Sequence, residues 1–235
     1  SEITSKTAKK LRSDIIKNYY RDVRVLRRKL TFKKIEEVIV EIEDSLWVSI
    51  FETNKEPKIK LEVLKEKLNF IKETLLKEHK SLFLDELQDL IDKVNIFGYH
   101  FATLDIRQDS TIHSDVFKEI IKTYFKKQLR GKYENLSEEK KIQILSRLDV
   151  RINSNKFQND LAKSTIESIE IISQIQKSNG EKGCHRYIIS NNYSSVNIIE
   201  VFTMIRLTLG NNFNVDIVPL FESISSDSIK SPNEL

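Results

Sequence analysis

Tyr99-His-Phe-Ala-Thr-Leu-Asp-Ile106, Arg186-Tyr-Ile-Ile189 and Val215-Asp-Ile-Val-Pro-Leu220 are the three segments that decide the fold. Each is short, apolar or alternating, and rich in residues that favour β-strands. Helical stretches at residues 113–129 and 195–209 follow the first two. Strands that alternate with helices predict a parallel sheet built from crossover connections. Because three strands are too few to close a barrel, we expect part of a TIM-like α/β barrel.

The rest of the chain is predicted to be helical, since its 235 residues include only five Gly and three Pro. Five leucines and isoleucines between Leu61 and Leu75 recur at steps of three and four, which predicts helix-on-helix packing. A similar stripe runs from Ile35 to Ile50, with Thr31 as its expected N-cap. We therefore expect a mainly α protein with long helices around the strands. Residues 1–96 would form a helical part and residues 97–235 a partial barrel part of one continuous piece.

Two further helices are marked by their first residues and by an apolar stripe. Ser137, followed by two glutamates, is expected to open a short helix, because acidic residues suit a first helical turn. Leu161, Ile169 and Ile172 predict a long helix that ends near Gly180.

Composition indicates an ordinary soluble protein, with 39% hydrophobic and 31% charged residues. No apolar run approaches the eighteen or so residues that a membrane span needs, and no signal peptide is recognisable. The single cysteine, Cys184, has no partner for an internal disulfide, which fits a reducing cytoplasm. We expect Cys184 to be a small buried apolar residue.

Positive charge is concentrated at the beginning of the sequence. Residues 1–35 contain twelve Lys or Arg and three acidic residues, although the net charge of the whole chain is only +4. A basic first helix could meet nucleic acid or a membrane surface. The alternative is a solvated face whose charges pair with acidic neighbours. The absence of aromatic interleaving and of a recognition motif favours this alternative and leaves a nucleic-acid binder as the weaker hypothesis.

Several common chemistries have no support in the sequence. The five glycines are too far apart for a phosphate-binding loop, and no G-x-S-x-G motif presents a serine nucleophile. The four histidines lack the HExxH spacing and Cys184 lacks a CxxC partner, which argues against a zinc site. Hydrolase, nucleotide-binding and zinc readings are therefore set aside.

Arg107 and Glu222 stand out by their position. Arg107 follows directly on the first strand-like segment, and Glu222 follows closely on the third. In parallel α/β barrels, polar residues just past the carboxyl ends of the strands carry the chemistry. An arginine suits phosphate or carboxylate, and a glutamate suits Mg²⁺ or Mn²⁺. Each is also common as a structural ion-pair partner, so spacing alone leaves both readings open.

Longer motifs show a family resemblance. Phe97-Gly98-Tyr-His-Phe-Ala-Thr-Leu-Asp-Ile-Arg-Gln-Asp-Ser110, with His113, resembles the F-G-x-H-x-x-x-L-D-I-R-Q-D-S-x-x-H segment of phosphoenolpyruvate carboxylases. Val218-Pro-Leu-Phe-Glu-Ser223 is similar to the V-P-L-F-E-T segment of that family. Residues 20–32 resemble the helix that follows the family's G-D-R-D-G-N-P motif. The resemblance covers most of this sequence and a minority of the family's length.

Departures from the family pattern also carry information. Asn191 and Asn197 stand where the family's S-M-x-x-x-x-S-D segment has Met and Asp. The sequence contains no T-A-H-P-T-E, G-D-R-D-G-N-P, G-Y-S-D-S-x-K-D or G-R-G-G motif. We therefore expect an interior piece of a carboxylase rather than a diverged complete one.

The resemblance implies an enzyme that joins phosphoenolpyruvate and bicarbonate into oxaloacetate and phosphate with Mg²⁺ or Mn²⁺. Arg107 matches the arginine that binds the substrate phosphate, and Glu222 matches one of two carboxylates that bind the metal. The catalytic histidine and second carboxylate have no counterpart here. We therefore expect no catalytic residue, no bound metal and no activity in this chain alone.

The expected partners are the rest of the longer chain and further copies of it in a homo-oligomer. A non-catalytic helical interaction module is the main alternative function.

Overall fold

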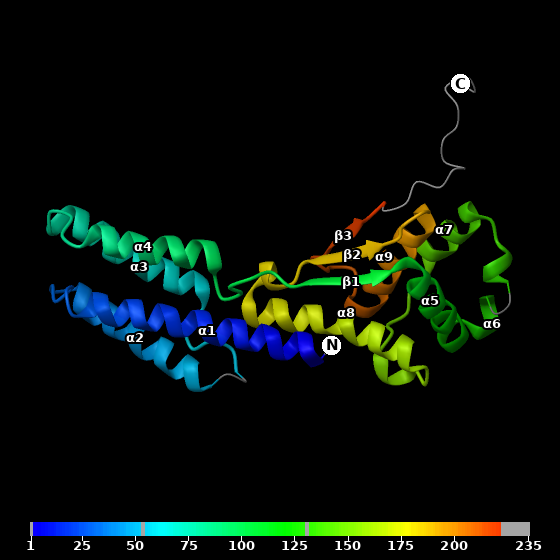
Figure 1. Cartoon of the computed structure of the whole chain (residues 1–235), viewed down its shortest axis with the longest axis horizontal. Helices are drawn as coiled ribbons and strands as arrows, with labels where there is room; N and C mark the ends of the chain where they lie inside the picture. The colour runs from blue at the N-terminus through cyan, green and yellow to red at the C-terminus, as the bar shows by residue number, and fades with distance from the viewer. Residues whose placement is uncertain (1, 53–54, 130–131, 222–235) are drawn as a thin grey trace, which may run out of the picture. The chain divides into compact units, whose positions relative to one another are not determined.

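The computed structural model describes residues 2–52, 55–129 and 132–221 (Figure 1). These residues divide into two compact units. The first consists of residues 2–104 and 174–183, and the second of the described residues among 105–173 and from 184 onwards. The described chain is mostly helical and contains one three-stranded parallel sheet, which confirms the predicted mainly α class with parallel strands.

Four helices build the first unit: α1 (Glu2–Arg27), α2 (Ile35–Phe51), α3 (Leu61–Glu78) and α4 (Leu84–Phe97). Helix α1 packs against α2 and α4, and α3 packs against the same two helices (Figure 1). Each helix therefore buries its apolar stripe against two neighbours, as expected of a helical bundle.

The bundle core follows the predicted stripes. Leu64, Leu68, Ile71 and Leu75 of α3 are all buried, which confirms the helix-on-helix packing. Tyr19 lies fully buried among them and donates its hydroxyl hydrogen bond to the Gly98 carbonyl oxygen at 2.7 Å. A buried tyrosine needs such a partner, because an unpaired hydroxyl in an apolar core is costly.

The N-cap prediction for α2 was wrong, because Lys34 rather than Thr31 precedes the helix. The amides of Ile35 and Glu36 both donate to the Phe32 carbonyl oxygen, at 3.0 and 2.9 Å. Because of this turn, the helix begins at Ile35.

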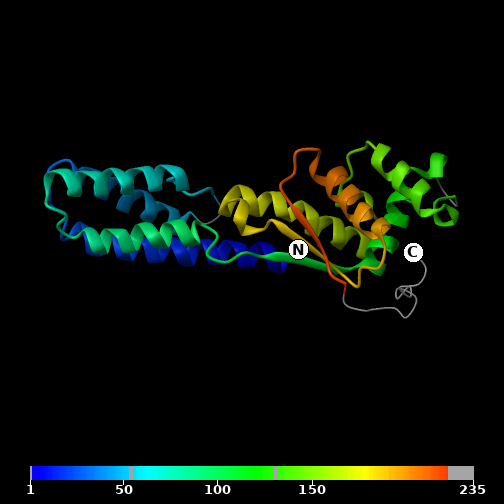
Figure 2. The ribbon, with the colours of Figure 1, turned by 90° about the horizontal axis from the view of Figure 1, so that it is seen from above.

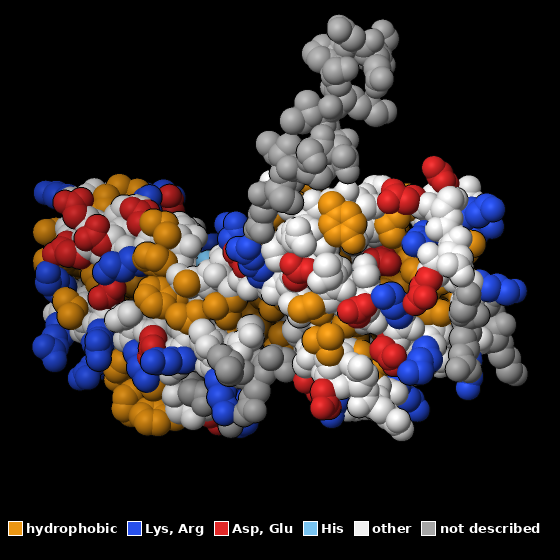
Figure 3. All heavy atoms as spheres, turned by 45° about the vertical axis from the view of Figure 1, so that its right-hand side comes forward, with side chains coloured by type: hydrophobic (Ala, Val, Ile, Leu, Met, Phe, Trp, Pro, Cys, Tyr) orange, Lys and Arg blue, Asp and Glu red, His pale blue; other side chains and the backbone are white. Residues whose placement is uncertain are grey.

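The basic residues near the start of the sequence pair with carboxylates of the same unit. Arg24 and Arg27 both approach Glu43, at 3.6 and 2.6 Å. Lys29 pairs with Glu86 at 2.7 Å. On the face drawn in Figure 3, basic and acidic side chains are intermixed. The pairing supports a solvated, charge-balanced face and weakens the nucleic-acid hypothesis.

Across the helices that the structure describes, none has the length and apolar character needed to span a membrane.

The second unit holds the sheet, whose strands are β1 (Asp105–Asp109), β2 (Arg186–Ser190) and β3 (Asp216–Pro219). Both neighbouring pairs are parallel, in the order β1-β2-β3. The connection from β2 to β3 is α9 (Ser195–Leu209), as predicted. The longer connection from β1 to β2 contains α5 (Ser110–Tyr124), α6 (Lys126–Leu129), α7 (Glu138–Arg147), α8 (Asp160–Asn179) and the short 3-10 turns Tyr133–Asn135, Ser154–Lys156 and Glu181–Gly183.

The first strand begins later than the sequence predicted. Residues 99–104 are not a strand, and Tyr99 is instead buried in the helical unit, where its hydroxyl donates to the Ile59 carbonyl oxygen at 2.8 Å. Of this segment, Tyr99 alone is buried, and Phe101 is 38% exposed. Asp109 caps α5 by accepting a hydrogen bond from the Thr111 amide, so that helix starts at Ser110 rather than near 113.

One face of the sheet packs against helices (Figures 1 and 2). Ile106, Tyr187 and Ile189 point to this side and are buried. The Tyr187 hydroxyl lies 3.0 Å from His113 Nε2 on α5, and it also hydrogen bonds Ser168 on α8. Burial lowers the pKa of His113 to about 4, so its imidazole is neutral at physiological pH.

Cys184 is buried, as predicted. Burial raises the pKa of its thiol to about 11. Since the thiolate is the reactive form, this cysteine is a packing residue.

Candidate functional site

The other face of the sheet carries exposed polar side chains. Asp105 of β1 lies opposite Arg186 of β2 in the strand register, and Arg186 Nε donates to Asp105 Oδ1 at 2.9 Å. Asp216 of β3 continues the same row. These rows alternate with the helix-facing residues, because successive side chains of a strand point to opposite faces.

Arg107 occupies the next row on this face, opposite Ile188 of β2, which in turn lies opposite Val218 of β3. It is exposed and is the third residue of β1. The prediction that Arg107 follows the strand was therefore wrong, because β1 extends to Asp109, three positions beyond Ile106. On this face, the permanently charged guanidinium of Arg107 lies in one row with two aliphatic side chains, those of Ile188 and Val218.

Hydrogen bonds tie the carboxyl ends of the three strands together. Ser110 Oγ donates to the Asn191 carbonyl oxygen at 2.6 Å. The Asn192 amide donates to Leu220 at 3.0 Å, and the Leu220 amide donates to Ile189 at 2.8 Å. Glu222 is the second residue after Leu220 and lies outside the described residues. Asn191 itself has a positive φ of 53°, a conformation that asparagine tolerates better than most residues.

The two carboxylates of β1, at its two ends, are both engaged in the structure. Asp109 Oδ1 accepts from the amide and the hydroxyl of Thr111, at 2.8 and 2.6 Å, and these bonds hold the pKa of Asp109 below its usual value. Asp105 is paired with Arg186. In the described part of the chain, no group of three or more His, Cys, Asp or Glu could hold a metal ion.

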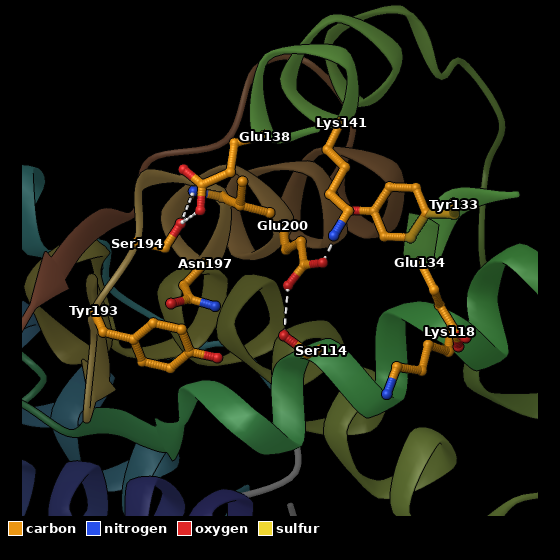
Figure 4. A pocket seen from close by; sticks show the side chains of 11 residues that line it. Ser114, Lys118, Tyr133, Glu134, Glu138, Lys141, Tyr193, Ser194, Asn197 and Glu200 are labelled. Carbon is orange, nitrogen blue, oxygen red and sulfur yellow. Dashed lines mark hydrogen bonds between the residues drawn. The ribbon is translucent and has the colours of Figure 1, made fainter. Parts of the chain in front are cut away.

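The structure also shows a pocket that the sequence did not reveal, between α5, α7 and α9 (Figure 4). Its volume is about 340 Å³. Glu200 of α9 lies at its floor with 3% of its surface exposed. The hydroxyls of Tyr133 and Ser114 each donate to one Glu200 oxygen at 2.9 Å. The only sequence signal was that Glu200 is the single acidic residue of helix 195–209.

Burial raises the pKa of the Glu200 carboxyl, and the two hydroxyls together with Lys141 and Lys118 oppose this shift. A raised pKa in the folded state means that the fold binds the proton more tightly than the unfolded chain does. The stability that Glu200 contributes is therefore complete below its unfolded pKa and is lost as pH rises through the folded pKa.

We expect Glu200→Gln to flatten the pH dependence of stability, because an amide keeps the shape of the side chain and cannot ionise. Urea unfolding of the native chain should show stability falling, relative to this variant, as pH rises above the ordinary pKa of a glutamate. Glu181→Gln changes an exposed glutamate and is the matched control. If the free energy of unfolding depended on pH in the same way in the native chain and in Glu200→Gln, the raised pKa of Glu200 would be contradicted.

Comparisons with known proteins agree with the motif resemblance. A family model described as phosphoenolpyruvate carboxylase matches residues 1–232. The phosphoenolpyruvate carboxylase of Prochlorococcus marinus strain MIT 9312 is 30% identical over 167 residues, which cover 67% of this chain and 16% of the relative. The phosphoenolpyruvate carboxylase of Gloeobacter violaceus is 32% identical over 147 residues, or 59% of this chain and 15% of the relative. The chain thus spans about one sixth of the length of these relatives.

Proposed function

Because the chain belongs to the phosphoenolpyruvate carboxylase family, we propose that it is part of a longer enzyme that joins phosphoenolpyruvate and bicarbonate into oxaloacetate and phosphate. The observation that carries the proposal is the place of Arg107. It lies within the D-I-R-Q-D strand, on the sheet face opposite the packed helices.

Arg107 is proposed to bind the phosphate of phosphoenolpyruvate. A guanidinium presents a planar set of donors that matches a phosphate in two parallel charge-assisted hydrogen bonds. Its row neighbours are the aliphatic side chains of Ile188 and Val218. The carboxylate of Asp105, on the same face, pairs with Arg186.

The three strands are proposed to be one part of the wall of a TIM-like barrel. In such barrels, alternate strand residues point to the helix layer and to the barrel interior. Tyr187 and Ile189 occupy the helix side, whereas Arg107 and Arg186 occupy the other. Further strands from the longer chain would pair with β1 and β3, and the exposed face would become the interior of the barrel.

Glu222 is proposed to contribute one carboxylate to the Mg²⁺ or Mn²⁺ site of the longer enzyme. The proposal rests on the V-P-L-F-E segment and on the hydrogen bonds that join Leu220 to Ile189 and Asn192 at the carboxyl end of β2. A single carboxylate holds Mg²⁺ weakly, since this ion gives up its water reluctantly. The other ligands would come from elsewhere in the longer chain.

The test is an assay for oxaloacetate formed from phosphoenolpyruvate and bicarbonate by the longer enzyme, native and with Arg107 replaced. We further propose a cytoplasmic homo-oligomer, for which light scattering of the longer enzyme would give the number of copies. The single cysteine of the sequence, Cys184, agrees with that compartment.

A further inference from the structure

One peptide group joins the carboxyl ends of all three strands, which lie at the same edge of the sheet (Figure 1). It is the peptide between Asn191 and Asn192, directly after β2. Ser110 Oγ donates to its carbonyl oxygen at 2.6 Å, and its amide donates to the Leu220 carbonyl oxygen at 3.0 Å. Ser110 follows β1, and Leu220 follows β3. A side chain at the end of the first strand therefore reaches the third strand through one rigid unit.

The geometry of a peptide group links these two hydrogen bonds. Its carbonyl and its amide lie in one plane and point in opposite directions, because the C–N bond has partial double-bond character. A donor that fixes the carbonyl therefore also fixes the direction of the amide. The two bonds also polarise each other, since the peptide accepts on one side and donates on the other. Loss of the Ser110 hydroxyl would therefore weaken the bond to Leu220.

The end of β3 depends on this peptide. Its last residue, Pro219, has no amide hydrogen to donate. Leu220 makes two backbone bonds there: its carbonyl oxygen accepts from Asn192, and its amide donates to the Ile189 carbonyl oxygen at 2.8 Å. The first of these bonds involves the peptide that Ser110 orients.

The end of β1 holds Asn191 from two adjacent residues. Ser110 is fully buried, so water does not compete with its hydroxyl for the Asn191 carbonyl oxygen. The Asn191 side chain also hydrogen bonds the Asp109 carboxylate. Asn191 has a positive φ of 53°, which costs free energy in any residue but glycine, and these two bonds offset that cost.

We propose that Ser110 is a positioning residue, which fixes the end of β3 relative to β1 through the peptide between Asn191 and Asn192. The consequence for the reaction rests on the proposed function: Arg107 lies on β1, and the V-P-L-F-E segment begins at the end of β3. A displacement of about 1 Å between reacting groups can cost about 100-fold in rate. Ser110 thus acts on the rate through the backbone of these two strands.

Hydrogen exchange of the 235-residue chain, followed by NMR, tests the tie itself. In Ser110→Ala, the Asn192 amide should exchange about fivefold faster, as expected for the loss of one ordinary hydrogen bond. The Ile152 amide is the internal reference, because it donates to the Leu207 carbonyl oxygen at 3.0 Å in the same unit. Unchanged exchange at Asn192, or equal acceleration at both amides, would overturn the proposal.

Ser154→Ala is the matched control variant. Ser154 is also buried in this unit, and its hydroxyl donates to Glu170 Oε2 at 2.8 Å, so the substitution removes a bond at least as strong. It should leave exchange of the Asn192 amide unchanged. The same acceleration of that amide in Ser154→Ala would contradict a specific role of Ser110.

The longer enzyme tests the effect on the reaction. Ser110→Ala should lower kcat about tenfold and leave KM for phosphoenolpyruvate within about twofold, because Arg107 keeps its strand pairing with β2. Ser154→Ala should keep a near-native kcat. A native kcat in Ser110→Ala, or an equal fall in both variants, would overturn the positioning role. If Arg107→Ala kept its native kcat/KM, the proposed function would fail, whereas the exchange result at Asn192 would still decide whether Ser110 holds the strand ends.

Discussion

Replacing Arg107 by alanine in the longer enzyme is expected to lower kcat/KM for phosphoenolpyruvate by about 10- to 150-fold, with little change in thermal stability. Hydrogen bonds to charged groups contribute roughly 1.5–3 kcal/mol, and each 1.4 kcal/mol is a factor of ten. The loss is larger if the transition state uses these bonds more strongly than the substrate does. Stability should persist because Arg107 points away from the helices that pack against the sheet.

Two further variants sharpen this test. Arg107→Lys retains the positive charge and should still lose substantial activity, because an ammonium group cannot reproduce the planar pair of donors. Arg147→Ala removes an exposed arginine from the last turn of α7 and serves as the control with an unchanged rate. Near-normal turnover and substrate affinity in Arg107→Ala would reassign this residue to a structural ion pair.

Replacing Glu222 by glutamine in the longer enzyme is expected to reduce activity by at least about two orders of magnitude and to raise the Mg²⁺ concentration needed for half-maximal rate. Glutamine has nearly the same shape and lacks the negative charge that a hard divalent cation prefers. The measurement is oxaloacetate formation over a titration of Mg²⁺ and, separately, of Mn²⁺. Glu181→Gln is the control, because Glu181 is an exposed glutamate of a 3-10 turn in the other unit.

The rate of Glu222→Gln and the dependence of that rate on metal concentration test two different points. A lower rate whose metal dependence is unchanged would place Glu222 outside the metal site while keeping it important. A native rate with native metal dependence would remove Glu222 from the proposed site altogether.

The helices and the parallel sheet were predictable because their signals are local. The stripe in α3 and the alternation of strand-like and helical segments need only neighbouring residues to be read. The start of the strand was misplaced because Tyr99 belongs to the core of the helical unit, where its hydroxyl bonds the Ile59 carbonyl oxygen forty positions earlier. The expected cap at Thr31 failed for a related reason, since the turn at Phe32 fixes the start of α2.

The candidate site, like the fold, was predictable only where its signals are local. Arg107 was found through a long motif, but its place inside β1 depends on pairing with residues about eighty positions later. The pocket at Glu200 was missed because its partners come from distant elements: Ser114 precedes it by 86 residues and Tyr133 by 67. No local pattern marks an acid that is buried by such contacts.

The central claim is that this chain supplies part of a carboxylase site and needs the longer enzyme to complete it. The most direct measurement is oxaloacetate formation by the 235-residue chain beside that of the longer enzyme, at equal molar concentration with Mg²⁺, bicarbonate and phosphoenolpyruvate. The account predicts rapid formation by the longer enzyme and, for the 235-residue chain, a rate equal to the no-protein background. Arg107 is the proposed phosphate ligand, and Glu222 alone of the proposed metal ligands belongs to this chain. Oxaloacetate produced by the 235-residue chain above that background would contradict the claim.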